Sequence, residues 1–322
     1  MKQIKKLLFF FTILFSIISC TNTNDDSTIY VGDLTFSTQK QIDDFGENNY
    51  TKVAGNITIG DRTAAPNSEI NNLNGLSKLL SIDNNLYITN NISLSNLEGL
   101  NNLISINKDV FIENNENLVN INQLNNLSSI GSLIIKDNNA LNNINGLSGL
   151  FTIKKDITIL LNNSLTNIDG LSGISSIIGS VFITKNNSLN NIDGLSNIRE
   201  INKELSINDN DALININGLN NIESIGNSLF INNNNLLSNI SGLSKLSSIG
   251  ENLLIENNPA ITNLNGLSNL LTVKSIDVKN NLALNNLCAV QPMIVNTQIG
   301  FSFRGNGYNP FPQKFIDGDC SK

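Results

Sequence analysis

Aliphatic residues recur along most of the chain with a period of about 24 residues, and each repeat opens on a Gly-Leu pair. These pairs begin at Gly75, Gly99, Gly146, Gly170, Gly194, Gly218, Gly242 and Gly266. Gln123-Leu124 fills the one gap in the series, so the body contains nine repeats, with steps of 23 or 24 residues. Steps this regular indicate a repeat architecture rather than an ordinary globular core.

The apolar positions inside each repeat predict one short strand between turns. Counted from the Gly, positions 2, 5, 8, 12, 14, 20 and 23 are aliphatic. In the third and ninth repeats one residue is missing between positions 8 and 12, after which the pattern resumes. Positions 12 and 14 alternate as the inward residues of a strand do, and no segment of ten or more residues has a helical period. Each repeat is therefore predicted to be one coil of an all-β solenoid, which buries its apolar residues only against its neighbours.

Asparagine supplies 63 of the 322 residues, and two positions of the repeat are invariably Asn. Position 17 holds Asn91, Asn115, Asn138, Asn162, Asn186, Asn210, Asn234, Asn258 and Asn281. Position 22 holds Asn96, Asn120, Asn143, Asn167, Asn191, Asn215, Asn239, Asn263 and Asn286. A stacked Asn at a corner can bond the backbone of its own turn and the side chain of the next coil. We expect a structural role for both positions, with ligand binding as the alternative.

Position 13 lies between the two inward residues of the strand and is therefore expected to point outward. Six of its nine occupants are aromatic or aliphatic, and they are the candidate binding residues: Tyr87, Phe111, Ile134, Phe182, Phe230 and Leu254. The other three are Thr158, Ser206 and Asp277. An outward apolar stripe along a sheet is a candidate contact surface. The alternative is that these residues are β-formers, partly shielded by their neighbours across the strands.

Composition and charge exclude several classes of catalytic site, metal site and binding partner. The chain contains no His, which excludes catalysis by a Ser-His or Cys-His pair and any His-ligated zinc or haem site. A net charge of −7 argues against a nucleic-acid partner, because phosphate binding requires a basic patch. Carboxylates are scattered singly, arginine is confined to Arg62, Arg199 and Arg304, and no phosphate-binding or calcium-binding loop is present. We expect a non-enzymatic protein without a cofactor or metal; a polysaccharide lyase is the enzymatic alternative.

The N-terminus has the pattern of an export signal. Three lysines precede an apolar stretch over 7–18, which is too short to span a bilayer. The sequence Ile17-Ile18-Ser19-Cys20 resembles a bacterial lipobox, which implies cleavage before Cys20 and its acylation. The resemblance implies a signal peptide over 1–19 and a membrane partner through the acyl chains. An acylated flexible tether is expected over 20–35, where Asp25-Asp26 resembles an export signal of bacterial surface lipoproteins. An ordinary secretory peptide is the alternative.

The two remaining cysteines lie at either end of the C-terminal segment. Cys288 closes the last repeat and Cys320 is close to the C-terminus. Outside the cytoplasm such a pair is most simply a disulfide, which would stabilise this segment by roughly 3–4 kcal/mol on the chain-entropy model. A metal site is the alternative, although two Cys without His form an incomplete ligand set.

The repeat is similar to that of two related families. The Leu-x-Ile-x-x-Asn-x-x-Leu segment over 205–213 looks like a leucine-rich repeat, and the Gly-Leu and Ser-Ile segments resemble the receptor L-domain family. That resemblance implies a right-handed parallel β-helix-like solenoid of about ten 24-residue coils. It covers 36–322, with an N-terminal cap over 36–52, coils over 53–287 and a C-terminal cap over 288–322. The first coil would place Val53, Ile57 and Ile59 in the core.

The resemblance also bears on function, because the matching sheet face of receptor L-domains carries ligand contacts. We therefore expect a lipid-anchored, surface-exposed outer-membrane protein that binds an unknown protein, peptide or glycan through one sheet face. A structural spacer of the cell envelope is the principal alternative.

Overall fold

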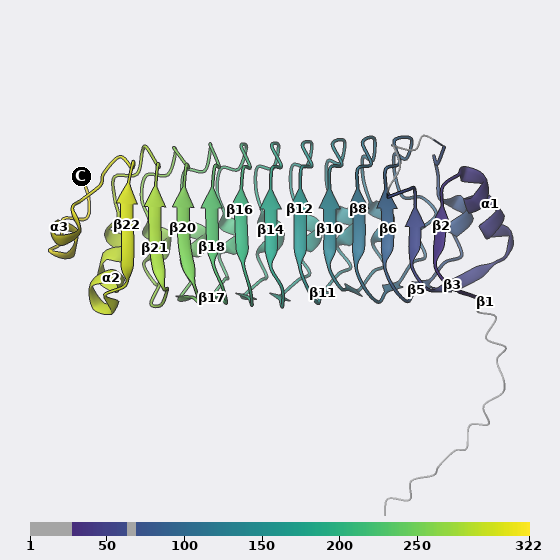
Figure 1. The fold of residues 1–322 in the computed structure, drawn as a ribbon, viewed down its shortest axis with the longest axis horizontal. Helices are drawn as coiled ribbons and strands as arrows, with labels where there is room; N and C mark the ends of the chain where they lie inside the picture. The colour runs from purple at the N-terminus through teal and green to yellow at the C-terminus, as the bar shows by residue number, and fades with distance from the viewer. Residues whose placement is uncertain (1–27, 63–68) are drawn as a thin grey trace, which may run out of the picture.

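The computed structural model describes residues 28–62 and 69–322, and most of them belong to parallel sheets of one elongated, solenoid-like body (Figure 1). Every strand pairing within these sheets is parallel, so equivalent strands of successive repeats run in the same direction side by side. The longest sheet has twelve strands: β2 Leu34–Phe36, β4 Ile57–Ile59, β6 Leu86–Thr89, β8 Val110–Glu113, β10 Leu133–Lys136, β12 Ile157–Leu160, β14 Val181–Thr184, β16 Leu205–Asn208, β18 Leu229–Asn232, β20 Asn252–Glu256, β21 Ser275–Lys279 and β22 Gly300–Arg304.

Two further sheets run along a second side of the body. One contains β1 Thr28–Val31, β3 Tyr50–Ala54, β5 Ser81–Ile82 and β7 Ser105–Ile106. The other contains β9 Ser129–Ile130, β11 Thr152–Ile153, β13 Ser176–Ile177, β15 Glu200–Ile201, β17 Ser224–Ile225 and β19 Ser248–Ile249. These strands are mostly the Ser-Ile pairs at positions 7 and 8, so a second strand per repeat accompanies the predicted one.

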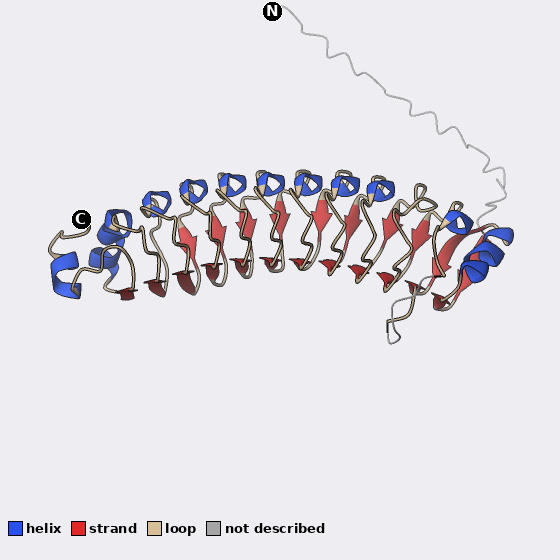
Figure 2. Cartoon of the chain, turned by 90° about the horizontal axis from the view of Figure 1, so that it is seen from above, coloured by secondary structure: helices blue, strands red, loops and turns tan. Residues whose placement is uncertain are grey.

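Short 3-10 helices form a row along the convex side of the gently bowed body (Figure 2). They are η1 Asn74–Leu76, η2 Asn122–Leu124, η3 Asn145–Leu147, η4 Asp169–Leu171, η5 Asp193–Leu195, η6 Asn217–Leu219, η7 Ser241–Leu243, η8 Asn265–Leu267 and η9 Cys288–Val290. The twelve-stranded sheet lies on the opposite side, in front of these helices in Figure 1.

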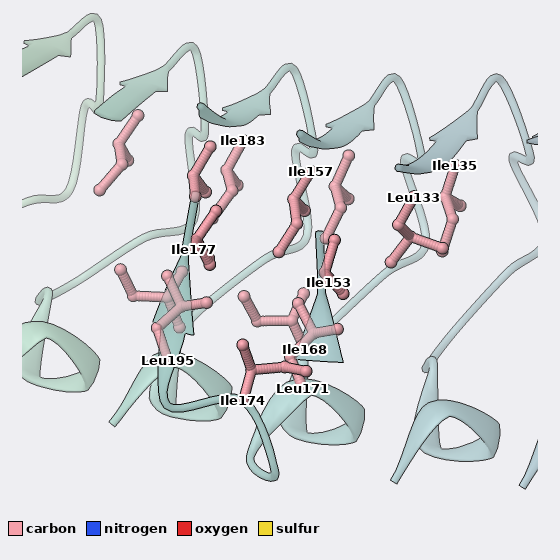
Figure 3. Close-up of a cluster of buried hydrophobic side chains, with 14 of the residues drawn as sticks. Leu133, Ile135, Ile153, Ile157, Ile168, Leu171, Ile174, Ile177, Ile183 and Leu195 are labelled. Carbon is pink, nitrogen blue, oxygen red and sulfur yellow. The ribbon is translucent and has the colours of Figure 1, made fainter. Parts of the chain in front are cut away.

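The core is a continuous aliphatic column between the sheets and the helices. Side chains from positions 2, 5, 8, 12, 14, 20 and 23 of the nine repeats are buried. Figure 3 shows several of them pointing into the interior from neighbouring repeats, among them Ile157, Ile168, Leu171 and Ile177. The predicted strand with inward positions 12 and 14 is confirmed, as is the burial of Val53, Ile57 and Ile59.

The position-17 asparagines form a buried ladder along the body, and all nine have no exposed surface. Asn162 is typical: its backbone N–H and its Nδ2 both donate to Oδ1 of Asn186 in the next repeat, at 3.1 and 3.3 Å. The same Nδ2 also donates to the carbonyls of Ile135 and Leu160. The ladder continues past the repeats, because Asn281 donates to Oδ1 of Asn306. The expected structural role of position 17 follows from these contacts, which satisfy backbone groups that a corner would otherwise leave unpaired.

The position-22 asparagines act within their own turn. In each of the nine repeats the Oδ1 atom accepts a hydrogen bond from the backbone N–H two residues later, as Asn167 does from Asp169 at 3.2 Å. In all but the first of these repeats that residue begins a 3-10 helix. An Asn side chain that bonds the backbone two residues on is an Asx turn, so position 22 sets the start of the helical turn.

The N-terminal cap begins earlier than the sequence predicts. The expected cap over 36–52 contains helix α1 Gln39–Glu47, which is capped by Thr38 and buries Ile42 and Phe45. However, β1 and β2 already pair with β3 and β4, so residues from 28 onward belong to the sheets and not to a tether extending to residue 35. Burial of Phe36 and half-burial of Tyr30 against Phe45 explain the earlier start. The predicted signal peptide and Cys20 lie outside the described residues.

The C-terminal cap combines η9 with α2 Gln291–Thr297, β22 and α3 Pro312–Ile316. Strand β22 pairs in register with β21, so the cap extends the twelve-stranded sheet instead of only covering its end. Phe315 of α3 is fully buried against Phe301 and Phe303 of β22. Cys288 and Cys320 form a disulfide with a Cα–Cα distance of 4.8 Å, so the two ends of the cap are joined covalently.

Candidate functional site

The outer surface of the twelve-stranded sheet carries the candidate binding residues. We call it the long-sheet face and define it as positions 11, 13 and 15 of the nine repeats. All six candidates are half-buried on this face: Tyr87, Phe111, Ile134, Phe182, Phe230 and Leu254. The register aligns them in one row, because each position 13 pairs with position 13 of the next strand. They are therefore neither core residues nor freely exposed ones.

At the N-terminal end of the row, aromatic faces pack against each other. The rings of Tyr87 and Phe111 are stacked with centroids 4.6 Å apart and planes 18° apart. The Arg62 guanidinium lies 4.2 Å from the Tyr87 centroid, and Asn85 Nδ2 donates to the Tyr87 hydroxyl at 3.0 Å. The same guanidinium lies 5.8 Å from the Phe111 centroid, so one cation lies close to both rings of the stacked pair.

The centre of the row has a different arrangement. Phe182 and Phe230 pair with Ser206 from either side, and Ser206 is only 5% exposed. The Ser206 hydroxyl accepts a hydrogen bond from Asn208 Nδ2 at 2.6 Å. The burial of Ser206 agrees with the alternative expectation that outward residues partly shield their neighbours across the strands. Ser206 nevertheless separates Phe182 from Phe230, so no third ring lies between these two.

The C-terminal end of the row is charged. Asp277, which pairs with Leu254, forms ion pairs with Arg304 at 3.2 Å and Lys279 at 3.7 Å. Lys279 also contacts Glu256 at 3.1 Å. The row therefore changes from aromatic to ionic along the body, and its apolar part ends at Leu254.

One charged group near the centre of the long-sheet face has no partner. Glu204, at position 11 and directly before β16, is half-buried, and its carboxylate has no hydrogen bond or ion pair with any residue that the structure describes. Burial raises the pKa of this carboxyl group above its ordinary value of 4.5. Sequence reasoning passed over Glu204 because a single carboxylate in a repeat carries no motif.

A second apolar row lies outside the predicted site. Position 6 follows the buried position 5 directly and carries large exposed side chains in four repeats: Leu80, Ile104, Phe151 and Leu271. Phe151 is 60% exposed and Leu271 is 66% exposed, so both are far more accessible than any residue of the position-13 row. The row is interrupted by serines and by the Arg199–Glu223 ion pair. The sequence did not predict this row, because two adjacent apolar residues in a turn give no periodicity that shows which one is exposed.

An open polar groove lies over the loops that follow β6, β8 and β10. Its lining is almost entirely amides and carboxylates, from Asn90, Ile92, Asn114, Glu116, Asp137 and Asn139.

Across the described residues, no cluster of three or more His, Cys, Asp or Glu side chains is placed to hold a metal ion. The three arginines stand apart, over Tyr87, beside Glu223 and beside Asp277. Nor does any helix in 28–62 or 69–322 have the length and apolar character needed to cross a membrane.

Comparison with known proteins leaves the family open. No protein-family model matches the chain, and no curated protein matches it.

Proposed function

We propose that the chain is a non-enzymatic binding protein that recognises a protein, peptide or glycan partner through the long-sheet face. The observation that carries the proposal is the in-register row from Tyr87 to Leu254, in which all six aromatic and aliphatic residues are half-exposed. Aromatic residues set in a ring of polar ones commonly supply most of the energy of an interface. The rows on either side of position 13 are largely polar, which would give such a rim.

We propose further that the solenoid is a right-handed parallel β-helix of about ten coils, of the receptor L-domain type. Nine strands of the twelve-stranded sheet come from the nine repeats, and β4 precedes them as a tenth. In this proposal β2 and β22 belong to the caps. The solenoid would display the long-sheet face as an extended platform, with consecutive anchors about 4.8 Å apart.

The anchoring proposal rests on the N-terminal sequence alone. Acylation of Cys20 would attach the protein to the outer membrane with the solenoid exposed at the cell surface. Replacing Cys20 with Ser should leave an unprocessed or mislocalised precursor that takes up no palmitate analogue. Labelling of the Cys20→Ser variant together with outer-membrane fractionation would refute the anchor without touching the binding proposal.

The experiment that tests the binding face compares two matched quadruple variants of the full chain on glycan and protein arrays. The first replaces Tyr87, Phe111, Phe182 and Phe230 with Ser. The second makes the same change in the exposed position-6 row: Leu80, Ile104, Phe151 and Leu271. We expect the first variant to fold with a slightly lower melting temperature and to lose binding that the second retains. The reverse pattern would move the site to the position-6 row.

A spacer of the cell envelope is the second candidate function, and one observation favours it. Phe111 stacks on the Tyr87 ring and Arg62 lies close to both rings, so this aromatic residue already has contacts within the chain. If the long-sheet quadruple variant folds and every array signal is unchanged, the spacer function would be favoured.

A further inference from the structure

The centre of the long-sheet face has unused hydrogen-bonding capacity beside two unstacked rings. Strands β14, β16 and β18 carry Phe182, Ser206 and Phe230 at position 13, and each strand is directly preceded by its position-11 residue: Ser180, Glu204 and Ser228. Position 15 of the same strands holds Thr184, Asn208 and Asn232. We call these nine residues the central patch. The residues of a row on neighbouring strands stand about 4.8 Å apart, which makes the patch about 10 Å wide.

Two groups in the central patch are acceptors without donors. The Glu204 carboxylate has no partner among the described residues, although Lys203 precedes it in the chain. The Asn232 Oδ1 atom is buried and likewise has no hydrogen-bond partner in the described part of the chain. The Asn232 oxygen has no accessible surface, whereas Glu204 is only half-buried, so the carboxylate is the acceptor that a donor from a ligand can reach.

The flanking rings narrow the chemistry of that donor. Phe182 and Phe230 are two strands apart, and a group above Ser206 would lie about 5 Å from each ring. A cation within about 6 Å of an aromatic centroid is attracted by the ring quadrupole. A primary ammonium supplies donors only, which matches the unpaired Glu204 carboxylate, whereas a sugar hydroxyl needs donors and acceptors together.

We infer that the central patch binds a protonated primary amine, the side chain of a lysine on a protein or peptide partner. The ammonium would lie over Ser206 between Phe182 and Phe230 and donate to the Glu204 carboxylate. The net charge of −7 favours the approach of a basic partner to this chain. The inference rests on the proposed function, since it assigns a ligand class to the same face.

Saturation-transfer NMR on the full chain tests the inference with a defined probe, Nα-acetyl-lysine methylamide. Its uncharged counterpart, the Nα,Nε-diacetyl compound, is the matched control ligand. We expect saturation at the ε-methylene protons of the lysine probe and at least a fivefold weaker signal from the diacetyl compound. Equal signals from the two ligands would overturn the assignment of an ammonium site.

Matched variants separate the site from general electrostatics. Glu204→Gln should reduce the signal of the lysine probe at least fivefold, as should the Phe182→Ser, Phe230→Ser double variant. Glu223→Gln removes the same charge from an exposed position paired with Arg199 and should leave the signal unchanged. Equal losses in the two Glu variants would show that only net charge matters and would overturn the inference.

A third ligand keeps this inference distinct from the proposed function. A neutral glucose hexasaccharide that binds the wild-type chain while the lysine probe does not would replace the amine with a glycan. In that case the long-sheet quadruple variant should still lose its array signals, and the binding face would stand without the lysine site.

Discussion

Asn186 and Asn210 occupy equivalent corners of adjacent repeats and are joined by two hydrogen bonds. The backbone N–H and the Nδ2 of Asn186 both donate to Oδ1 of Asn210, at 3.2 and 3.3 Å. The Nδ2 of Asn186 also donates to the carbonyls of Ile159 and Thr184. One fully buried side chain therefore holds three successive repeats in register.

Replacing Asn186 with Ala should lower the free energy of unfolding by about 3–5 kcal/mol. The reason is that the change strands the buried N–H of Asn162 and the Ile159 carbonyl, each at a cost of about 1–3 kcal/mol. The adjacent Asn187 is exposed, so Asn187→Ala is the matched control and should change stability by less than about 0.5 kcal/mol. Denaturant unfolding followed by circular dichroism measures the free energy of unfolding of both variants. Equally small changes in the two variants would show that the Asn ladder contributes little to stability.

Leu161 is a site where substitution should stabilise the protein. Its φ is +57°, in the left-handed region, and the equivalent position is Asn or Asp in seven of the nine repeats. Asn tolerates this backbone conformation better than a branched aliphatic residue does. Leu161→Asn should raise the free energy of unfolding by about 0.5–1 kcal/mol. The reciprocal change Asn233→Leu, at a φ of +56°, should lower it by a similar amount. Opposite signs in the two thermal melts are the required result.

The recurring glycine at position 1 is explained by close approach between repeats. A Cβ added to Gly218 would lie 1.9 Å from the carbonyl oxygen of Ile192, two residues before Gly194, the equivalent glycine of the preceding repeat. Because this neighbour is backbone, Gly218→Ala should force the two coils apart and destabilise the fold by about 2–4 kcal/mol. Gly300→Ala is the control, since a Cβ there meets no atom within 4 Å. A silent Gly218→Ala variant would contradict the packing of the 3-10 helices.

Much of this architecture is predictable from sequence because the same positions are buried in every repeat. The inward direction of Leu205 and Ile207 follows from strand alternation, and the nine-fold recurrence of the pattern removes the ambiguity of any single short strand. The 3-10 helices escaped prediction because three residues such as Asn217–Leu219 contain less than one helical repeat of polarity. The Asn217 N–H donates to Oδ1 of Asn215, so the invariant Asn at position 22 marks where such a helix begins.

The candidate site was only partly predictable, for reasons that lie in the contacts between coils. Alternation placed Tyr87 and Phe230 on the outer face of the sheet, but it could not show that Arg62 covers one ring. The lack of a hydrogen-bond or ion-pair partner for Glu204 depends on where the side chains of neighbouring repeats lie, which the sequence does not specify. Exposure of Phe151 depends on the path of a turn, which residue periodicity does not specify.

The disulfide between Cys288 and Cys320 should stabilise the C-terminal cap more than the rest of the body. The double variant Cys288→Ser, Cys320→Ser loses a cross-link that closes a loop of about 33 residues, worth roughly 3–4 kcal/mol. We expect faster amide hydrogen exchange over 288–322, including the segment around the buried Phe315, with the central repeats unchanged. Uniform acceleration along the whole chain would instead mean that the cap controls global unfolding.

The charge of Glu204 should destabilise the fold near neutral pH, and the sign follows from its pKa. Burial raises the pKa of this carboxyl group above the ordinary value of 4.5 that it regains on unfolding, so the folded state binds its proton more tightly. The contribution of Glu204 to stability is therefore most favourable in acid, below the unfolded pKa, and is lost as the pH rises through the folded pKa.

Glu204→Gln removes the ionisation and should raise the melting temperature near neutral pH, with a gain that shrinks as the pH falls towards 4.5. Glu223→Gln, the exposed control, removes the same charge and should not raise the melting temperature near neutral pH. A Glu204→Gln variant that melts lower than the wild type near neutral pH would mean that the carboxylate has a stabilising partner in solution, which would also weaken the inference that a ligand amine occupies the central patch.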